Sequence, residues 1–269
     1  MKTFKFLSVI AVTAMLASCS QVPLTGRSQL SLVNDEALQQ EAVTAYRSFL
    51  NDPKTKVINN SADAQRVKAV GAKIASAINR YMQNNGYGNK YNYQYEFNLI
   101  NSKEINAWCM PGGKVAVYTG ILPITQNDAG LATVMGHEIA HAIAQHAAER
   151  YSQMTAAQIG GGVIGAAAGG ASQGTQQVLG QLYGIGGQLA ILNYSRKQES
   201  EADRLGLVFM AMAGYNPDSA VGFWQRMAAA NKGGAPPEFL STHPSDATRI
   251  SQIKSNLPEA RKYYTGAKK

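Results

Sequence analysis

Two long stretches near the start of the chain carry apolar residues at helical spacing. They run from Leu38 to Leu50 and from Ser61 to Met82, and we predict a helix for each. In the second stretch, apolar residues recur three or four positions apart, which places them along one face. Ser61 suits the N-cap of this helix, and Asp63 suits its positive first turn. The apolar positions on that face are Val67, Val70, Ile74, Ile78 and Tyr81.

A different period follows. Tyr91, Tyr93, Tyr95, Phe97 and Leu99 alternate with polar residues, which predicts a half-buried strand.

Two further short strands are predicted at 106–110 and 114–118, joined by the turn sequence Pro111-Gly112-Gly113. From Asp128 onward the pattern is almost wholly helical. The order of helices, a small antiparallel sheet and more helices indicates a mostly helical α+β fold.

The N-terminus has the pattern of a secretory signal. Lys2 and Lys5 precede an uncharged apolar run from Phe6 to Leu16, which is too short to span a bilayer. It ends in Leu16-Ala17-Ser18-Cys19, which resembles a bacterial lipobox, the motif in which the cysteine is lipidated and becomes the first mature residue. Residues 1–18 are therefore a predicted lipoprotein-type signal peptide, with an ordinary secretory signal as the alternative.

Lipidation of Cys19 would anchor the chain in a membrane. Ser20 stands where enterobacterial sorting to the inner membrane uses aspartate, so we expect the outer membrane and a periplasm-facing domain. Residues 19–35 are polar and contain Pro23 and Gly26, which predicts a tether. Residues 36–265 are then predicted to form one folded domain.

The charge and the cysteine content argue against two other classes of protein, nucleic-acid-binding proteins and disulfide-stabilised scaffolds. The net charge is +8, from 25 Lys and Arg against 17 Asp and Glu, but no basic run exceeds two residues. A scattered charge of this kind argues against nucleic-acid binding. With only two cysteines the chain has no disulfide scaffold, and lipidation of Cys19 would leave Cys109 alone.

The chemistry starts at the sequence His137-Glu138-Ile139-Ala140-His141. On a helix that Asp128 caps and that runs to Ala147 and beyond, the two histidines lie one turn apart and can reach one metal ion. Glu138 can orient a water molecule and take its proton, as in zinc hydrolases. Surface residues of a helix are the alternative interpretation.

A catalytic zinc site of this type needs a third protein ligand. Cys109, upstream on a strand, would be unusual beside two histidines. Glu199 and Asp203 are four residues apart on a predicted helix, so they share a face, whereas Glu201 points elsewhere. This spacing suits Glu199 as the ligand and Asp203 as the partner of a ligand imidazole. A solvated charged face remains the alternative.

These motifs together resemble the CAAX-prenyl-protease and HtpX-type zinc metallopeptidases, which pair H-E-x-x-H with E-x-x-A-D, here Glu199 to Asp203. Asn106-Ala107-Trp108 with Pro111-Gly112-Gly113 is similar to the edge-strand segment of that family. Thr242-His243-Pro244 with Arg249 is similar to its C-terminal signature.

The resemblance implies a gluzincin fold in which His137, His141 and Glu199 hold one Zn²⁺ and Glu138 is the general base. It also implies a soluble periplasmic lipoprotein that degrades unfolded or misassembled envelope proteins. A substrate backbone would add to the edge strand as an extra strand. His243 would either donate to the oxyanion or close the site as a fourth zinc ligand.

Two features stay outside this scheme. His146 lies five residues past His141, off the ligand face, and we interpret it as structural, paired with Glu149. The segment 151–195 has no charged residue and many Gly, Ala and Gln residues, and it predicts a packed helical hairpin over the cleft or a disordered stretch. Such a hairpin could contact a membrane or a partner.

The rival function is a latent-site chaperone or assembly factor for outer-membrane proteins, acting alone or in an oligomer. A metal-storage or sensor lipoprotein is weaker, because such a site needs no base beside the first ligand. The retained Glu138 favours the peptidase.

Overall fold

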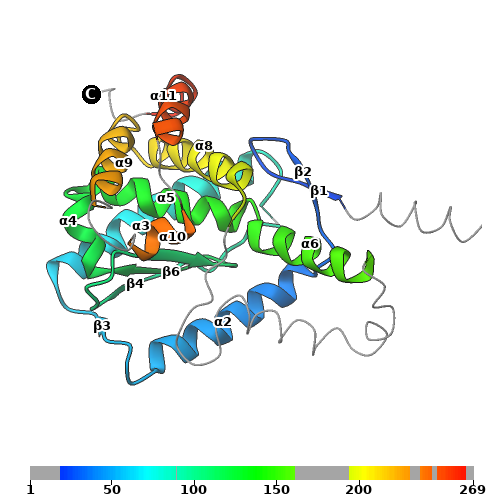
Figure 1. Ribbon diagram of the computed structural model, residues 1–269, viewed down its shortest axis with the longest axis horizontal. Coiled ribbons are helices and arrows are strands. Elements are labelled where there is room, and N and C mark those ends of the chain that lie inside the picture. Colours follow the sequence, from blue (N-terminus) through cyan, green and yellow to red (C-terminus); the bar gives the residue numbers. More distant parts are fainter. Residues whose placement is uncertain (1–18, 89, 161–193, 231–236, 244–246, 265–269) are drawn as a thin grey trace, which may run out of the picture.

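The computed structural model describes residues 19–88, 90–160, 194–230, 237–243 and 247–264 (Figure 1). The predicted signal peptide and residues 161–193 of the uncharged segment lie outside the described residues. No helix in the described part is both long and apolar enough to cross a membrane.

The strands are β1 (Cys19–Gln21), β2 (Ser28–Leu30), β3 (Val57–Ile58), β4 (Glu96–Ile100), β5 (Ala107–Met110) and β6 (Lys114–Tyr118). The helices are α2 (Asp35–Asn51), α3 (Ala62–Asn84), the 3₁₀ turn η1 (Thr119–Ile121), α4 (Leu122–Thr125), α5 (Asp128–Ile143), α6 (His146–Gly160), α8 (Arg196–Met212), α9 (Ser219–Ala230), α10 (Glu238–Thr242) and α11 (Ala247–Arg261). The two early predicted helices and the strands of the β5–β6 hairpin are confirmed, and Ser61 caps α3 as expected.

The main sheet has the strand order β3-β4-β6-β5 and is mixed, so the expectation of a purely antiparallel sheet is wrong. β3 pairs with β4 and β5 with β6 in antiparallel fashion, whereas β4 and β6 are parallel. The reason is the path of the chain. It leaves β4, crosses to the far position as β5 and reverses at the Pro111 turn, which returns β6 to the middle in the direction of β4.

The sheet separates two apolar cores (Figure 1). Successive side chains of a strand point to opposite faces. On β6, Val115 and Val117 therefore enter the main core with α3 and α5, while Ala116 and Tyr118 face the smaller core under α2. Burial on both faces explains why all five residues of β6 are buried.

The alternating aromatic stretch forms a strand only in its second half. Phe97 and Leu99 belong to β4, but Tyr91, Tyr93 and Tyr95 precede it as irregular backbone, so the predicted strand is too long. Their rings contact one another in sequence order, with centroids about 6 Å apart from Tyr91 through to Phe97, tilted in the first two pairs and stacked in the pair of Tyr95 and Phe97. The alternation therefore reflects ring packing on the core, where Tyr91 and Tyr93 are buried, and not a strand ladder.

Helix α5 runs through the middle of the main core. Asn127, not Asp128, caps it, since the Asn127 side chain accepts a hydrogen bond from the Gly130 N–H. The helix ends at Ile143 because Gln145 adopts a left-handed conformation with φ of 54°, and α6 begins at His146. The expected continuous helix to Ala147 and beyond is therefore wrong.

Helix α8 packs closely on α5 through two glycines. A Cβ atom on Gly206 would lie 2.9 Å from the His137 nitrogen, and one on Gly136 would lie 2.9 Å from the Gly206 oxygen. Only residues without a side chain permit this distance between the backbones. The close crossing brings the first half of α8 alongside the last turns of α5.

The segment 19–35, predicted as a tether, is folded onto the domain. β1 and β2 form an antiparallel hairpin, with Cys19 opposite Leu30. Val22 is 1% exposed and belongs to the main core. Arg27 forms ion pairs with Glu149 of α6 and Glu201 of α8. A polar composition predicts exposure, but here Thr25 and Arg27 have buried carboxylate partners.

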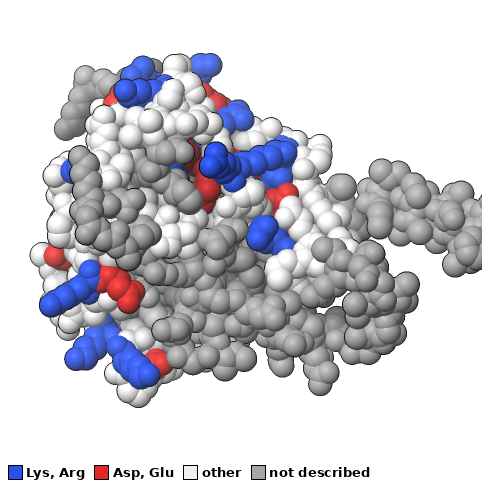
Figure 2. Space-filling model, in the orientation of Figure 1, with Lys and Arg blue, Asp and Glu red and all other residues white. Residues whose placement is uncertain are grey.

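The charged side chains of the face in Figure 2 lie in separate groups, with Asp and Glu beside Lys and Arg. This agrees with the scattered basic residues of the sequence.

Candidate metal centre

Four buried side chains from three helical elements converge on one point. His137 and His141 come from α5, Glu199 from the first turn of α8, and His243 from the C-terminal end of α10. His137 Nε2 lies 3.1 Å from His141 Nε2 and 3.2 Å from His243 Nδ1. Glu199 Oε1 lies 3.3 Å from His141 Nε2 and 2.8 Å from His243 Nδ1.

The spacing of these donor atoms fits a tetrahedral ion. Zinc binds histidine nitrogen and carboxylate oxygen at about 2.0–2.1 Å, so the donors of a tetrahedral site lie about 3.3 Å apart. The separations given above, from 2.8 to 3.3 Å, are close to this value. Three imidazole nitrogens and a carboxylate facing each other are also a set of lone pairs that a cation would satisfy. His137, His141 and Glu199 can therefore hold a metal ion, with His243 at the fourth position.

A carboxylate and an arginine support His137 from behind. Asp203 Oδ1 lies 3.0 Å from His137 Nδ1, the ring nitrogen that faces away from the cluster. Arg249 of α11 donates to both oxygens of Asp203 at 2.8 Å and lies 3.0 Å from Glu199 Oε2. Its guanidinium also stacks 3.5 Å above the ring of Trp224. Burial alone raises the pKa of Asp203, but Arg249 and His137 outweigh it and lower that pKa.

Glu138 lies beside the cluster with an unsatisfied oxygen. Its Oε1 is buried and has no hydrogen-bond partner among the described residues, and the nearest imidazole nitrogen, His243 Nε2, is 3.5 Å away. Burial raises the pKa of Glu138 to about 7. A carboxylate with this pKa can both accept and return a proton near neutral pH.

His141 contacts a second set of residues on its other side. Its Nδ1 lies 2.8 Å from Nδ1 of His146, and the ring of Tyr194 stacks on it with centroids 4.0 Å apart. His146 does not pair with Glu149 as expected. Its Nε2 lies 3.0 Å from Glu201 Oε2. The break at Gln145 explains the contact with His141, because on a continuous helix a residue five positions on would be turned away from it. The Glu149 carboxylate instead accepts hydrogen bonds from Arg27 and Gln198.

Arg27 links Glu201 and Glu149 to the N-terminal hairpin. It donates from Nε to Glu201 at 2.6 Å and from both terminal nitrogens to Glu149 at 2.7 and 2.9 Å. Burial alone raises the pKa of Glu201, but hydrogen bonds from His146, Thr25 and Arg27 outweigh it and lower that pKa to about 2. Glu201 therefore carries a buried charge that these donors stabilise.

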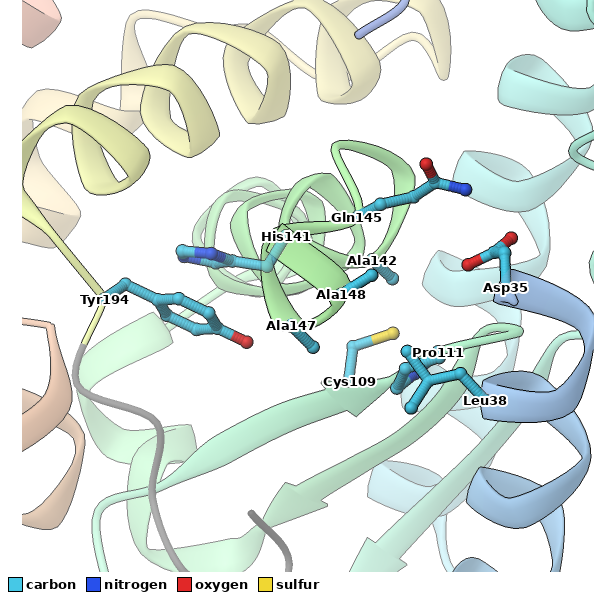
Figure 3. A pocket seen from close by; sticks show the side chains of 10 residues that line it. All are labelled: Asp35, Leu38, Cys109, Pro111, His141, Ala142, Gln145, Ala147, Ala148 and Tyr194. Atoms are coloured by element: carbon cyan, nitrogen blue, oxygen red, sulfur yellow. The ribbon is translucent and has the colours of Figure 1, made fainter. Parts of the chain in front are cut away.

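A pocket opens beside His141, between α5 and the Pro111 turn that follows β5 (Figure 3). Figure 3 shows the Tyr194 ring next to the His141 imidazole and the Cys109 sulfur pointing into the space between Ala148 and Pro111. Burial raises the pKa of the Cys109 thiol well above its usual value. Cys109, weighed as a third ligand, lines this pocket but is not one of the four converging side chains.

Spacing on a helix placed Glu199 and Asp203 on one face, and the structure puts both beside His137. It missed the roles of His146, Glu201, Arg27 and Tyr194. Arg27 and Tyr194 carried no signal in the local sequence pattern. Arg27 reaches α6 and Tyr194 reaches α5 only through the tertiary fold. His146 and Glu201 were visible as charged or titratable residues near the motifs, but their partners could not be read from periodicity.

One helix carries two histidines with a glutamate next to the first, and a second helix supplies another glutamate. This arrangement defines the class of the protein as a helical metallopeptidase. The chain belongs to peptidase family M48, whose family model matches residues 62–257. This range includes all four converging side chains.

Individual relatives agree with the class. The mitochondrial metalloendopeptidase OMA1 of Schizosaccharomyces pombe is 30% identical over 240 residues, covering 89% of this chain and 66% of that protein. OMA1 of Saccharomyces cerevisiae is 36% identical over 189 residues, covering 64% and 49%. The beta-barrel assembly-enhancing protease of Escherichia coli is 26% identical over 209 residues, covering 76% and 41%. The chain therefore spans between two fifths and two thirds of the length of these relatives.

Proposed function

We propose that the chain is a zinc endopeptidase that hydrolyses peptide bonds of unfolded or misassembled cell-envelope proteins. The observation that carries the proposal is the convergence of His137, His141, Glu199 and His243 on one point, with Glu138 beside it. When bound, zinc supplies positive charge that makes water a stronger acid and polarises a carbonyl group.

The residues of the chain divide the remaining work. Glu138 takes a proton from the attacking water and delivers it to the leaving amine, as its position beside the four converging side chains allows. Asp203 and Arg249 hold His137 and Glu199 in place. His243 closes the fourth position in the resting state. Once it moves away, it can donate a hydrogen bond to the developing oxyanion.

The substrate class follows from β5. β5 lies at the end of the strand order, so its outer edge can accept an extended peptide as an added strand. Recognition through backbone hydrogen bonds selects for extended, unfolded chains more than for particular side chains. The name of the Escherichia coli relative, which refers to beta-barrel assembly, agrees with a substrate from the envelope.

We place the protein at the outer membrane, held by lipid on Cys19 and facing the periplasm. The lipobox-like sequence before Cys19 supports this placement. Cys19 already belongs to the β1–β2 hairpin, so the lipid would attach at the edge of the folded domain without an intervening linker. Mass spectrometry of the mature protein tests it, since an unmodified Cys19 would contradict the anchor.

The test of the enzyme is cleavage of a reduced, alkylated protein by the zinc-loaded chain, beside Glu138→Gln. Loss of a general base costs roughly 10²–10⁴-fold in rate, and we expect the variant to bind zinc normally. Asp63→Asn on the exposed start of α3 is the matched control, which removes one carboxylate far from the site. Equal rates for wild type and Glu138→Gln would contradict the proposal.

One observation favours a second candidate, a latent-site assembly factor. His243 completes the ligand set, and a closed tetrahedral site is typical of structural zinc. If the zinc-loaded wild type and His243→Ala both fail to cut, this candidate gains. If only His243→Ala cuts, the site is a peptidase that His243 keeps closed.

A further inference from the structure

The two ligand histidines of α5 are supported in different ways. The Nδ1 atom of His137 contacts a carboxylate directly, at 3.0 Å from Asp203 Oδ1. The Nδ1 atom of His141 instead contacts a second imidazole, at 2.8 Å from His146 Nδ1, and that imidazole contacts Glu201 at 3.0 Å. His146 is 0% exposed and Glu201 is 8% exposed. A buried chain of this kind has no role in the hydrolytic step described above.

The hydrogen bonds between His141, His146 and Glu201 allow one arrangement of hydrogens when His141 is a metal ligand. Glu201 accepts hydrogen bonds from Arg27 Nε and the Thr25 hydroxyl, so it is a carboxylate and takes a third hydrogen from His146 Nε2. The Nδ1 of neutral His146 then carries a lone pair. Two ring nitrogens 2.8 Å apart share one hydrogen, which therefore belongs to His141 Nδ1.

This arrangement prepares His141 for its ligand role. An imidazole with its hydrogen on Nδ1 has a free lone pair on Nε2, and Nε2 is the atom that faces His137 and Glu199. Hydrogen bonds to the distal nitrogen of a ligand histidine fix its tautomer and its orientation and increase its basicity as a ligand.

We infer that His146 and Glu201 are positioning residues for the metal ligand His141, and that Arg27 and Thr25 make the N-terminal hairpin the outer part of the same support. The inference rests on the proposed metal site. It assigns a function to the hairpin, which lies in sequence more than 100 residues before its partners on α6 and α8.

A purely structural role is the competing explanation, because Arg27 also clamps Glu149 and so fixes the hairpin to α6. Glu149 separates the two ideas. It binds the same guanidinium through two hydrogen bonds and is as buried as Glu201, but it has no hydrogen bond to His146. Removing its charge loosens the hairpin and leaves the contacts from Glu201 through His146 to His141 intact.

The experiment measures zinc affinity of the full-length protein by competition with a fluorescent chelator, together with the absorption spectrum of the Co²⁺ form. The variants are Glu201→Gln and His146→Leu, compared with Glu149→Gln. Glu259→Gln is a further control, since it breaks the partly exposed carboxylate–arginine pair of Glu259 and Arg204 between α11 and α8. Loss of such an outer partner typically weakens metal binding about 10–100-fold.

We expect that weakening for Glu201→Gln and His146→Leu, with an altered Co²⁺ spectrum, and a change of at most severalfold for the two controls. His146→Asn should recover most of the affinity, because the Asn carbonyl oxygen can accept the hydrogen of His141 Nδ1 in place of the ring nitrogen. The recovery would not occur if His146 only filled space.

The inference is overturned if Glu201→Gln binds zinc as tightly as Glu149→Gln, or if His146→Asn binds as weakly as His146→Leu. Should His146→Leu fail to fold, the pair Glu201→Gln and Glu149→Gln decides the question. Because the readout is metal affinity, failure to cut a substrate would contradict the proposed function and not this inference.

Discussion

The close crossing of α5 and α8 should control the metal site more strongly than it controls stability. The perturbation is Gly206→Ala. The new Cβ would lie 2.9 Å from the backbone nitrogen of His137 and 3.0 Å from its Cα, whereas ordinary contacts begin at 3.4 Å. The difference, 3.4 minus 2.9, is 0.5 Å, and the obstacle is backbone that cannot rotate away. The helices must therefore separate by about this amount.

The cost to folding should be small because two effects oppose each other. Overpacking a core costs typically about 1–3 kcal/mol. Replacing glycine by alanine inside a helix gains about 0.5–1 kcal/mol. The net loss is then between zero and about 2.5 kcal/mol. The site is less tolerant, since a shift of 0.5 Å would stretch the 3.0 Å contact between Asp203 and His137 beyond a good hydrogen bond.

The assay is zinc affinity by chelator competition, with urea unfolding of the metal-free protein alongside. We expect zinc binding to weaken by about 10–100-fold, the range for loss of an outer-shell partner. Gly222→Ala on α9 is the matched control, because its Cβ would meet only the end of the Arg226 side chain. A Gly206→Ala protein that binds zinc normally and gains as much stability as Gly222→Ala would refute the reasoning.

Three further predictions concern the ion and its supporting charges. Chelation should lower the melting temperature by about 5–10 °C at a zinc concentration 100 times the Kd, since that binding contributes about 2.7 kcal/mol; an unchanged thermal transition would speak against a metal site. Arg249→Lys should weaken zinc binding and activity although the charge is kept, because one ammonium cannot bridge Asp203 and Glu199 as the planar guanidinium does; wild-type affinity would contradict this. Burial alone raises the pKa of Glu149, but Arg27 and Gln198 outweigh it and lower that pKa. The contribution of Glu149 to the stability of the folded protein is therefore complete above the unfolded pKa of about 4.3 and is lost as the pH falls through the folded value. Urea unfolding of metal-free wild type and Glu149→Gln should therefore differ at pH 7 and converge in acid, and a constant difference would contradict the assignment.

Local periodicity determined the parts of this protein that lie on one helix. Two histidines four residues apart share a face of any α-helix, as do Glu199 and Asp203, so their faces could be read from sequence. The capping of α3 by Ser61 and the two strands around the Pro111 turn are also local features. Each depends on backbone geometry within about one turn of the chain.

Periodicity failed where a single residue interrupted it. The left-handed Gln145 ends α5 and redirects His146 toward His141, which no helical projection could show. The tyrosine stripe before β4 has the period of a strand, but its rings pack on one another without a neighbouring strand to pair with. The same side-chain pattern is compatible with more than one backbone when the partner is unknown.

The sequence alone therefore determined the spacing of the candidate metal ligands on α5, the shared face of Glu199 and Asp203 on α8, and the mixed helix and strand content. Only the tertiary structure decided that β6 runs parallel to β4, that Arg27 reaches Glu149 and Glu201, and that His146 contacts His141. The physical reason is that a residue's spacing selects its face, whereas its partner depends on how distant segments pack. Buried charges such as Arg27 add a further requirement, because each must find an opposite charge wherever the fold places one.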